Sequence, residues 1–282
     1  MTTAREYSDV EYVFEPHSST MPNIREYIAS LWERREFSKE LAQSDLRAER
    51  SRTKLGNLWS VLDPLFMAAV YFFLYSVLRS SSEKQLEFLP ILIGGMFLFQ
   101  LSMGALNEGG ASIKRSKGLM LASTFPRALL PITTIYKLYR KFVFAGCVFA
   151  VIFILVGGQV GPGLFLLPLF FVLQMVMNIG IALLVSTYVT LVADGSNVIA
   201  YLARILFFAT PVIYPAAILP PGAKVLIAWQ PLFPLFSAYQ AILGGGTPSF
   251  SLLLQTMFWA FALLGFGAWM FLRRERDFTM HL

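Results

Sequence analysis

The chain has 282 residues, of which 56% are hydrophobic and only 14% are charged. Soluble domains carry about 25% charged residues, so this composition excludes an ordinary soluble protein and indicates a membrane protein that crosses the bilayer several times. The net charge of +6 does not indicate nucleic acid as a partner, because the basic residues stand at the ends of apolar segments, where they act as topology signals.

The first 57 residues are expected to stay outside the hydrocarbon region. Residues 1–22 show no apolar period and predict a mobile tail. From Asn23 onward one helical face becomes apolar while charged residues take the other. The apolar face consists of Ile24, Tyr27, Ile28, Leu31 and Trp32. Residues 23–57 are therefore predicted to form an amphipathic helix in the membrane interface, followed by a linker; a helix packed on a soluble partner would show the same pattern.

Six apolar segments predict an all-α, polytopic fold with six transmembrane helices between residues 58 and 272. Roughly 20 residues cross a bilayer, and the fourth segment, which is longer, is expected to tilt or to bend at Pro168. The predicted spans are residues 58–78, 88–108, 137–157, 164–192, 198–215 and 250–272. The loop 112–130 and the tail 273–282 then lie on the same side of the membrane as the N-terminal segment.

The basic residues orient this topology. Of the 23 lysines and arginines, all except Arg79, Lys84, Arg204 and Lys224 fall on the side that carries both ends of the chain. The positive-inside rule makes this side the cytoplasm. The chain is therefore expected in the plasma (inner) membrane, as a multi-pass protein with both termini inside.

The segment between the fifth and sixth spans is apolar but rich in proline. Seven of the fifteen prolines lie between Val198 and Pro248. Proline breaks or kinks a helix, and irregular backbone at membrane depth is tolerated only where protein covers it or where it lines a wet cavity. Residues 216–248 are therefore predicted to form re-entrant helices beside a pathway. The spans show no internal repeat, so a wide pathway would need two copies of the chain.

Few side chains in the spans could carry chemistry. Arg204 lies within the fifth predicted span, where an arginine costs about 2.5 to 3.5 kcal/mol. It must face protein or water, and it could meet a passing anion or pair with Glu108 or a helix end. Glu108 itself could serve in a structural ion pair or in gating. Aromatic residues of the first and fifth spans could stack on sugar rings or could simply pack and face lipid. With Arg204, the candidates for lining a channel are Tyr71, Tyr75, Tyr201, Phe208 and Tyr214.

No catalytic or metal site is expected. His17 and His281 are too isolated for metal ligation or a catalytic triad. Cys147, the one cysteine, lies in an apolar stretch and is expected to be buried. The sequence has no Gly-Lys dipeptide and therefore no Walker A loop. The chain is not expected to be an enzyme, and any ATP and Mg would be bound by a separate polypeptide.

Three groups of residues form a recognisable pattern. They are Asp45, Leu46, Arg47, Leu55, Gly56, Leu58, Trp59 and Pro64; then Phe125, Pro126, Arg127 and Pro131; then Pro211, Val212, Ile213, Tyr214, Pro231 and Leu232. With these residues the chain, from about residue 23 onward, resembles the membrane subunits of ABC-2 type polysaccharide exporters, which serve O-antigens, teichoic acids and cell-wall galactans. It departs from the pattern at Ala193, Gln230 and Gln240, where similar proteins often have Arg, Asn and Arg, so no role is built on charge there.

The resemblance implies how such a chain couples to ATP. It implies a gate helix at residues 24–36 and a coupling helix in the loop from Lys114 to Ala128, seated on the ATPase. The coupling residues would be Lys114, Arg115, Phe125, Pro126 and Arg127. Two copies of the chain would assemble with two copies of a separate ABC ATPase subunit. ATP-driven closure of the ATPase would shift the first and fifth spans at the dimer interface and open the channel.

The resemblance also implies a substrate, a polysaccharide linked to a polyprenyl diphosphate, with cell-wall galactan as the nearest branch. Its anionic diphosphate would be drawn to basic residues at the inner rim, although these also serve as topology signals. The candidates are Arg47, Arg50, Arg52 and Lys54. An ABC-2 subunit that exports drugs or lipids would share this topology. A membrane enzyme that acts on lipid-linked sugars should show paired acids or an Asp-rich loop, which the sequence lacks.

Overall fold

The computed structural model describes residues 24–52, 54–78, 82–122, 125–216, 219–220, 222 and 227–281. Throughout this part of the chain the regular structure is helical, and the one strand-like contact is a bridge between Gln159 and Gly244. The predicted all-α class is therefore confirmed. The predicted tail at residues 1–22, with Asn23, lies outside the described residues.

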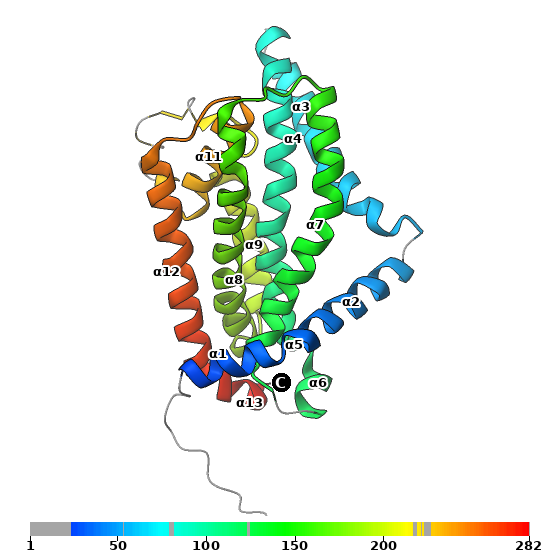
Figure 1. The fold of residues 1–282 in the computed structure, drawn as a ribbon, viewed down its shortest axis with the longest axis vertical. Coiled ribbons are helices and arrows are strands. Elements are labelled where there is room, and N and C mark those ends of the chain that lie inside the picture. The colour runs from blue at the N-terminus through cyan, green and yellow to red at the C-terminus, as the bar shows by residue number, and fades with distance from the viewer. Residues whose placement is uncertain are drawn as a thin grey trace, which may run out of the picture.

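Long helices run side by side through one bundle, and short helices connect them (Figure 1). The α-helices are α1 (Ile24–Glu33), α2 (Arg35–Arg52), α3 (Trp59–Leu78), α4 (Ser82–Gly104), α5 (Ser112–Arg115), α6 (Lys117–Ala122), α7 (Leu129–Leu155), α8 (Leu167–Leu191), α9 (Gly195–Ala209), α11 (Leu232–Leu243), α12 (Phe250–Arg274) and α13 (Phe278–His281). The 3-10 helices are η1 (Gly56–Leu58), η3 (Pro162–Leu166) and η5 (Glu275–Asp277), and η2 (Ala105–Gly109) is a π-helix that continues α4.

The two ends of the bundle differ. Helices α1, α6 and α13 gather at the lower end in Figure 1, whereas α11 lies near the upper end. We call the lower end the basic end, because Lys114, Arg115 and Lys117 lie on its short helices and α12 ends there with Arg273 and Arg274. This gathering of charge follows the pattern on which the predicted orientation depends.

The described residues contain five stretches that are long and apolar enough to cross a membrane, where six were predicted. They are Gly56–Phe73, Phe88–Gly109, Leu129–Leu155, Pro162–Leu191 and Phe250–Asp277. The fifth predicted span, residues 198–215, corresponds to α9, which has 15 residues and is therefore about 22 Å long. A hydrocarbon core is about 30 Å thick. The six-span prediction is not confirmed, because α9 ends at Ala209, ahead of Pro211.

Two helices begin ahead of the spans predicted within them. α7 begins at Leu129 and not at residue 137, because Lys137 is 1% exposed and lies well inside the helix. The second span, predicted from residue 88, agrees with the apolar stretch Phe88–Gly109, and its helix α4 extends back to Ser82. Pro168 lies in the first turn of α8, where proline has no helical hydrogen bond to break and does not bend the helix.

α8 lies at the centre of the bundle and contacts α7, α9, α11, α12 and η2. Its contact with α12 brings backbone against backbone. A Cβ on Gly267 would stand 2.4 Å from the carbonyl oxygen of Gly180, and one on Gly180 would stand 2.4 Å from the carbonyl carbon of Leu263. Small residues allow this close approach in membrane bundles, where packing replaces the hydrophobic driving force between helices.

The outer surface of the bundle is apolar, as lipid contact requires. α12 exposes Phe258, Phe261 and Phe266, and α7 exposes Val143. Cys147 on α7 is also exposed, so the prediction that it is buried is wrong. An apolar stretch indicates burial in a soluble protein, but in a membrane bundle it fits the lipid-facing surface equally well.

α11 is a short helix enclosed by the bundle. It has 12 residues, which makes it about 18 Å long and too short to span, and most of its side chains are buried against α4, α8 and α12. The buried Gln174 of α8 links α11 to the bundle. The Tyr239 hydroxyl donates to Gln174 Oε1 at 2.8 Å, and Gln174 Nε2 donates to the Leu98 carbonyl at 2.8 Å. One side chain thus bonds α4, α8 and α11.

Two glutamines satisfy the irregular backbone that follows α9. Gln240 Nε2 donates to the carbonyls of Pro211 and Tyr214, both at 2.7 Å, and Gln240 Oε1 accepts from the Ala216 amide at 3.0 Å. Gln230 Nε2 donates to the Ala209 carbonyl at 2.7 Å. Lipid would leave these backbone groups unpaired. Between Ala209 and Ala216 the irregular backbone is therefore hydrogen-bonded to protein side chains; the re-entrant path of residues 216–248 falls partly outside the described residues and stays a prediction.

Candidate functional site

A cavity of about 590 Å³ lies between α3, α4 and α9. Aromatic side chains from all three helices form much of its wall: Tyr71, Phe99, Phe207 and Phe208. The Tyr71 and Phe207 ring centroids are 5.4 Å apart, and those of Phe99 and Phe207 are 5.3 Å apart. Arg204 lines the same cavity. Its volume is within the range typical of small-molecule sites, about 300 to 1,000 Å³.

The cavity brings together three of the six residues predicted to line a channel: Tyr71, Arg204 and Phe208. Tyr201 lies beside them, 64% exposed, with its ring centroid 5.6 Å from the Arg204 guanidinium carbon. Tyr214 lies away from the cavity, where its hydroxyl donates to the Phe208 carbonyl at 3.1 Å and caps the end of α9. The side chain of Tyr75 lies outside the described part of the chain.

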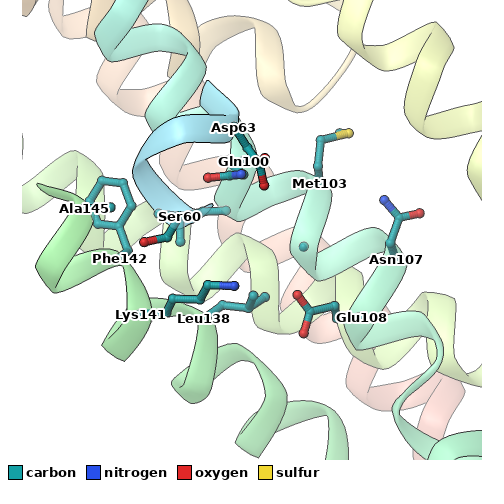
Figure 2. Close-up of a pocket in the computed structure, with 12 residues that line it drawn as sticks. Ser60, Asp63, Gln100, Met103, Asn107, Glu108, Leu138, Lys141, Phe142 and Ala145 are labelled. Atoms are coloured by element: carbon teal, nitrogen blue, oxygen red, sulfur yellow. The ribbon is translucent and has the colours of Figure 1, made fainter. Parts of the chain in front are cut away.

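A second cavity, of about 270 Å³, lies between α3, α4, η2 and α7. Figure 2 shows Lys141 and Glu108 pointing toward one end of it, with Asp63 and Gln100 at the other. The two cavities have Asp63, Gln100, Met103 and Asn107 in common. They therefore meet at one polar wall.

Sequence reasoning did not assign a role to this polar wall. The signal was present, because Gln100, Met103 and Asn107 follow one another at the three- and four-residue spacing of a single helix face. Asp63 reaches the same wall from α3. Polar side chains on one face of an apolar helix predict either water or a partner helix opposite.

A buried cation joins three helices next to the second cavity. Lys137 of α7 bonds Glu49 of α2 at 2.5 Å and Glu108 of η2 at 2.7 Å, and Lys141 stands 3.7 Å from Glu49. Burial acts to raise the pKa of Glu49, but the hydrogen bond and charge of Lys137 outweigh it and hold the pKa below its ordinary value. Both carboxylates thus stabilise a charge that could not stay buried alone.

This cluster places Glu108 in an ion pair with Lys137, and its role in gating stays a prediction. The predicted alternative of a pair between Glu108 and Arg204 is wrong, because Glu108 bonds Lys137 instead. Arg115 donates to the Glu108 backbone carbonyl at 3.5 Å. Glu108 lies in a π-helical turn, a feature that often marks functional sites.

The residues predicted to attract a diphosphate do not line either cavity among the described residues. Arg47 on α2 and Lys54 after it are exposed, and the side chains of Arg50 and Arg52 lie outside the described part. The cations that do reach the cavities are Lys141 and Arg204.

The predicted coupling residues divide into two groups. Lys114 and Arg115 belong to α5, next to α6, which extends beyond the basic end in Figure 1. Phe125, Pro126 and Arg127 are half-buried instead. The Phe125 ring lies 6.0 Å from that of Phe37 on α2. No contact with an ATPase is visible in a single chain, so their role stays a prediction.

Arg127 belongs to a hydrogen-bonded group that we call the junction: Tyr27, Arg127, Ala128 and Glu275. The Tyr27 hydroxyl donates to Glu275 Oε2 at 2.9 Å, and the Arg127 amide donates to Glu275 Oε1 at 2.7 Å. The Arg127 guanidinium donates to the Glu275 carbonyl, and the Ala128 amide donates to the Tyr27 hydroxyl at 3.3 Å. The junction fastens α1, the loop before α7 and the end of α12 to one another.

Burial raises the pKa of the Tyr27 hydroxyl, and the nearby charge of Glu275 raises it further. The hydroxyl therefore remains a neutral donor at physiological pH. Tyr27 and Leu31 pack on a small apolar cluster that includes Phe278, whereas Ile24, Ile28 and Trp32 are 60%, 59% and 69% exposed. The predicted apolar face of α1 is thus divided between the bundle and its surroundings.

Among the described residues the site contains no cluster of metal-binding side chains. Within these ranges no three His, Cys, Asp or Glu side chains come close enough to hold a metal ion. The geometry offers two adjoining cavities with an aromatic wall, a shared polar wall and two cations. Such a lining can contact both the apolar and the polar parts of a bound molecule.

Comparisons with known proteins agree with this arrangement. A family model described as ABC-2 type transporter matches residues 40–243. Two proteins named O-antigen export system permease protein RfbA are similar to this chain. The one from Klebsiella pneumoniae is 24% identical over 213 residues, 73% of this chain and 80% of its own length. The one from Myxococcus xanthus is 24% identical over 217 residues, 76% of this chain and 83% of its own length.

Proposed function

From the premise that this chain belongs to the ABC-2 type transporter family, we propose that it is the membrane subunit of an ATP-driven exporter of a lipid-linked polysaccharide. The polymer would be carried on a polyprenyl diphosphate, with cell-wall galactan as one candidate, and would pass from the cytoplasmic to the outer face of the plasma membrane. The similar proteins named for O-antigen export support this choice over an exporter of drugs or lipids.

One observation carries the proposal beyond the family: the cavity between α3, α4 and α9 combines aromatic faces with an arginine and a polar wall. Sugars have apolar ring faces and polar edges, so a saccharide can use both walls at once. A small apolar drug would leave Asp63, Gln100 and Asn107 unpaired at a cost in free energy. The lining therefore favours a saccharide.

The full passage would form between two copies of the chain. α3 exposes Phe66 and Val70, and α9 exposes Tyr201 and Ile205, on the helices that border the cavity. A second copy facing these helices would close the cavity against lipid. Since α9 is too short to span, the proline-broken segment beyond it would complete the outer half of the wall as a re-entrant element.

Coupling to ATP would use the basic end. Two copies of a separate ABC ATPase would bind ATP and Mg and press on α6 and the loop around Phe125 and Arg127. Through the junction, this movement would reach α1, which would lie in the membrane interface as a gate. Rearrangement of packed helices between two discrete states is the usual route for such transmission.

The test is a strain that lacks this chain. We expect it to lose surface polysaccharide and to accumulate the lipid-linked polymer inside the cell, and we expect the chain to purify with an ATPase. Replacing Phe125 and Arg127 by alanine should leave ATP hydrolysis and abolish export, whereas Arg273→Ala, a change of an exposed arginine on α12, should leave both. Normal surface polysaccharide in the deletion strain, with raised drug sensitivity, would favour the drug exporter instead.

A further inference from the structure

Three polar side chains of the shared wall have no internal partner among the described residues. Asp63, Gln100 and Asn107 make no side-chain hydrogen bond or ion pair with any residue of this part of the chain. The neighbouring polar groups behave differently, because Glu108 bonds Lys137 and Ser60 donates to the Asn57 carbonyl at 2.6 Å. The wall therefore presents free donors and acceptors to the cavities.

These groups lie at a depth where lipid would surround an ordinary helix. Gln100 precedes the end of η2 by roughly nine residues, and Arg204 follows the start of α9 by roughly nine, so each is about 13 Å from the basic end. Asp63 and Asn107 are exposed; Asp63 lies beside Gln100 (Figure 2), and Asn107 follows Gln100 along the chain and lies nearer the basic end. Unpaired polar groups are not tolerated against hydrocarbon. Something polar must fill the space before them.

The chemistry of the wall selects among polar occupants. Asp63 accepts hydrogen bonds, and the amides of Gln100 and Asn107 both donate and accept. Sugar hydroxyls are donors and acceptors in the same way. Across the cavity, Tyr71 and Phe207 offer apolar faces against which a sugar ring can lie. An anion alone would not use the carboxylate, and an acyl chain would use none of the three.

Arg204 stands on the third helix of the same cavity. Its guanidinium lies 5.6 Å from the Tyr201 ring centroid, and within the described residues it has no carboxylate partner. A guanidinium binds phosphate oxygens through two parallel hydrogen bonds. The cavity thus has a side chain that can bind phosphate, Arg204 on α9, facing a polar wall that can bind a sugar.

We propose that Asp63, Gln100 and Asn107 bind the first sugar of the lipid-linked substrate while Arg204 binds its diphosphate. This inference rests on the proposed function, and it names the part of the substrate that the cavity holds. The site recognises the junction between lipid and polymer, which every substrate molecule has once, and not the repeating sugars of the chain that follows.

The experiment measures binding to the full chain in lipid nanodiscs with its ATPase. The probes are farnesyl diphosphate and farnesyl diphosphate that carries one N-acetylglucosamine. We expect the glycosylated probe to bind more tightly. The double change Gln100→Leu and Asn107→Leu should lower the affinity for the glycosylated probe about tenfold. It should leave the affinity for the bare diphosphate unchanged. Arg204→Gln should lower the affinity for both probes.

Two further variants keep the result interpretable. Gln255→Leu removes a glutamine from the exposed surface of α12 and should change neither affinity. Asn107→Leu alone alters one exposed side chain and should lower the affinity for the glycosylated probe about threefold if the double variant does not fold.

The inference is overturned if the wild-type protein binds both probes equally, or if the variants keep the preference for the glycosylated one. If this happens while the complex still exports polymer, the sugar site is wrong and the proposed function stands. If a strain that lacks the chain exports polymer normally, the proposed function fails and the site fails with it.

Discussion

Replacing Glu275 by glutamine should release α1 from the bundle. α1 has no fully buried residue, so little apolar area holds it and the junction carries much of the attachment. Glu275 accepts from Tyr27 at 2.9 Å and from the Arg127 amide at 2.7 Å. Glutamine keeps one acceptor oxygen and places an NH2 group at the other position, which faces a donor and cannot accept from it.

The size of the effect follows from these bonds. A hydrogen bond to a charged group contributes roughly 1.5 to 3 kcal/mol. The Glu275→Gln protein loses one of its two such bonds, and the other is then made to a neutral amide oxygen. We expect the free energy of opening of α1 to fall by about 2 kcal/mol. Since 1.4 kcal/mol corresponds to a factor of about ten, the amides of residues 24–33 should exchange hydrogen for deuterium about 30 times faster.

Asp277→Asn is the matched control. Asp277 lies in the same short helix η5, but its carboxylate pairs with the exposed Arg274 at 3.2 Å. This substitution should leave exchange in α1 unchanged, and α8 should exchange equally slowly in all three proteins. Unchanged exchange of α1 in the Glu275→Gln protein would refute the role of the junction.

Three further substitutions test the packing of the bundle by thermal unfolding in detergent. Lys137→Met leaves Glu49 and Glu108 without their shared cation and should destabilise by about 3 kcal/mol, whereas Lys141→Met, which removes a looser pair of 3.7 Å, should cost under about 1 kcal/mol. Gly267→Leu should push α12 away from α8 and lower the free energy of unfolding by about 3 kcal/mol. Gly265→Leu is the control, because a Cβ there would meet no atom within 4 Å, and it should be tolerated. Equal effects of the two substitutions would exclude a close contact at Gly267. Gln240→Leu leaves two carbonyls and one amide unpaired and should cost about 3 kcal/mol, while Gln255→Leu should have little effect.

The apolar pattern predicted the end of a transmembrane helix accurately where charged residues directly follow the apolar segment. The sixth predicted span, residues 250–272, differs from α12 by two residues, because Ser249 caps its start with a side chain that accepts from the Leu252 amide and arginines mark its end. The start of α7 was predicted eight residues late for the same reason. A lysine at position 137 predicts the end of a span. Its buried partner Glu49 is 88 residues away in the sequence, so the pair could not be recognised from the local pattern.

The candidate site was predicted in part. Tyr71, Arg204 and Phe208 were chosen by residue type and span, and they do meet in one cavity. The polar wall was missed because amides within an apolar helix resemble packing residues until the opposite wall is known. The junction was missed because its members come from positions 27, 127 and 275, and the sequence has no local feature that relates them.

The most direct test of a water-filled passage is the reactivity of cysteines at matched depth. In a Cys147→Ser background, Gln100→Cys on the polar wall and Phe266→Cys on the lipid-facing surface of α12 both lie about 13 Å from the basic end. A thiol reacts as the thiolate, which needs water. A membrane-impermeant maleimide added to the basic end should label Gln100→Cys rapidly and Phe266→Cys hardly at all, whereas equal and slow labelling of the two would contradict a passage between α3, α4 and α9.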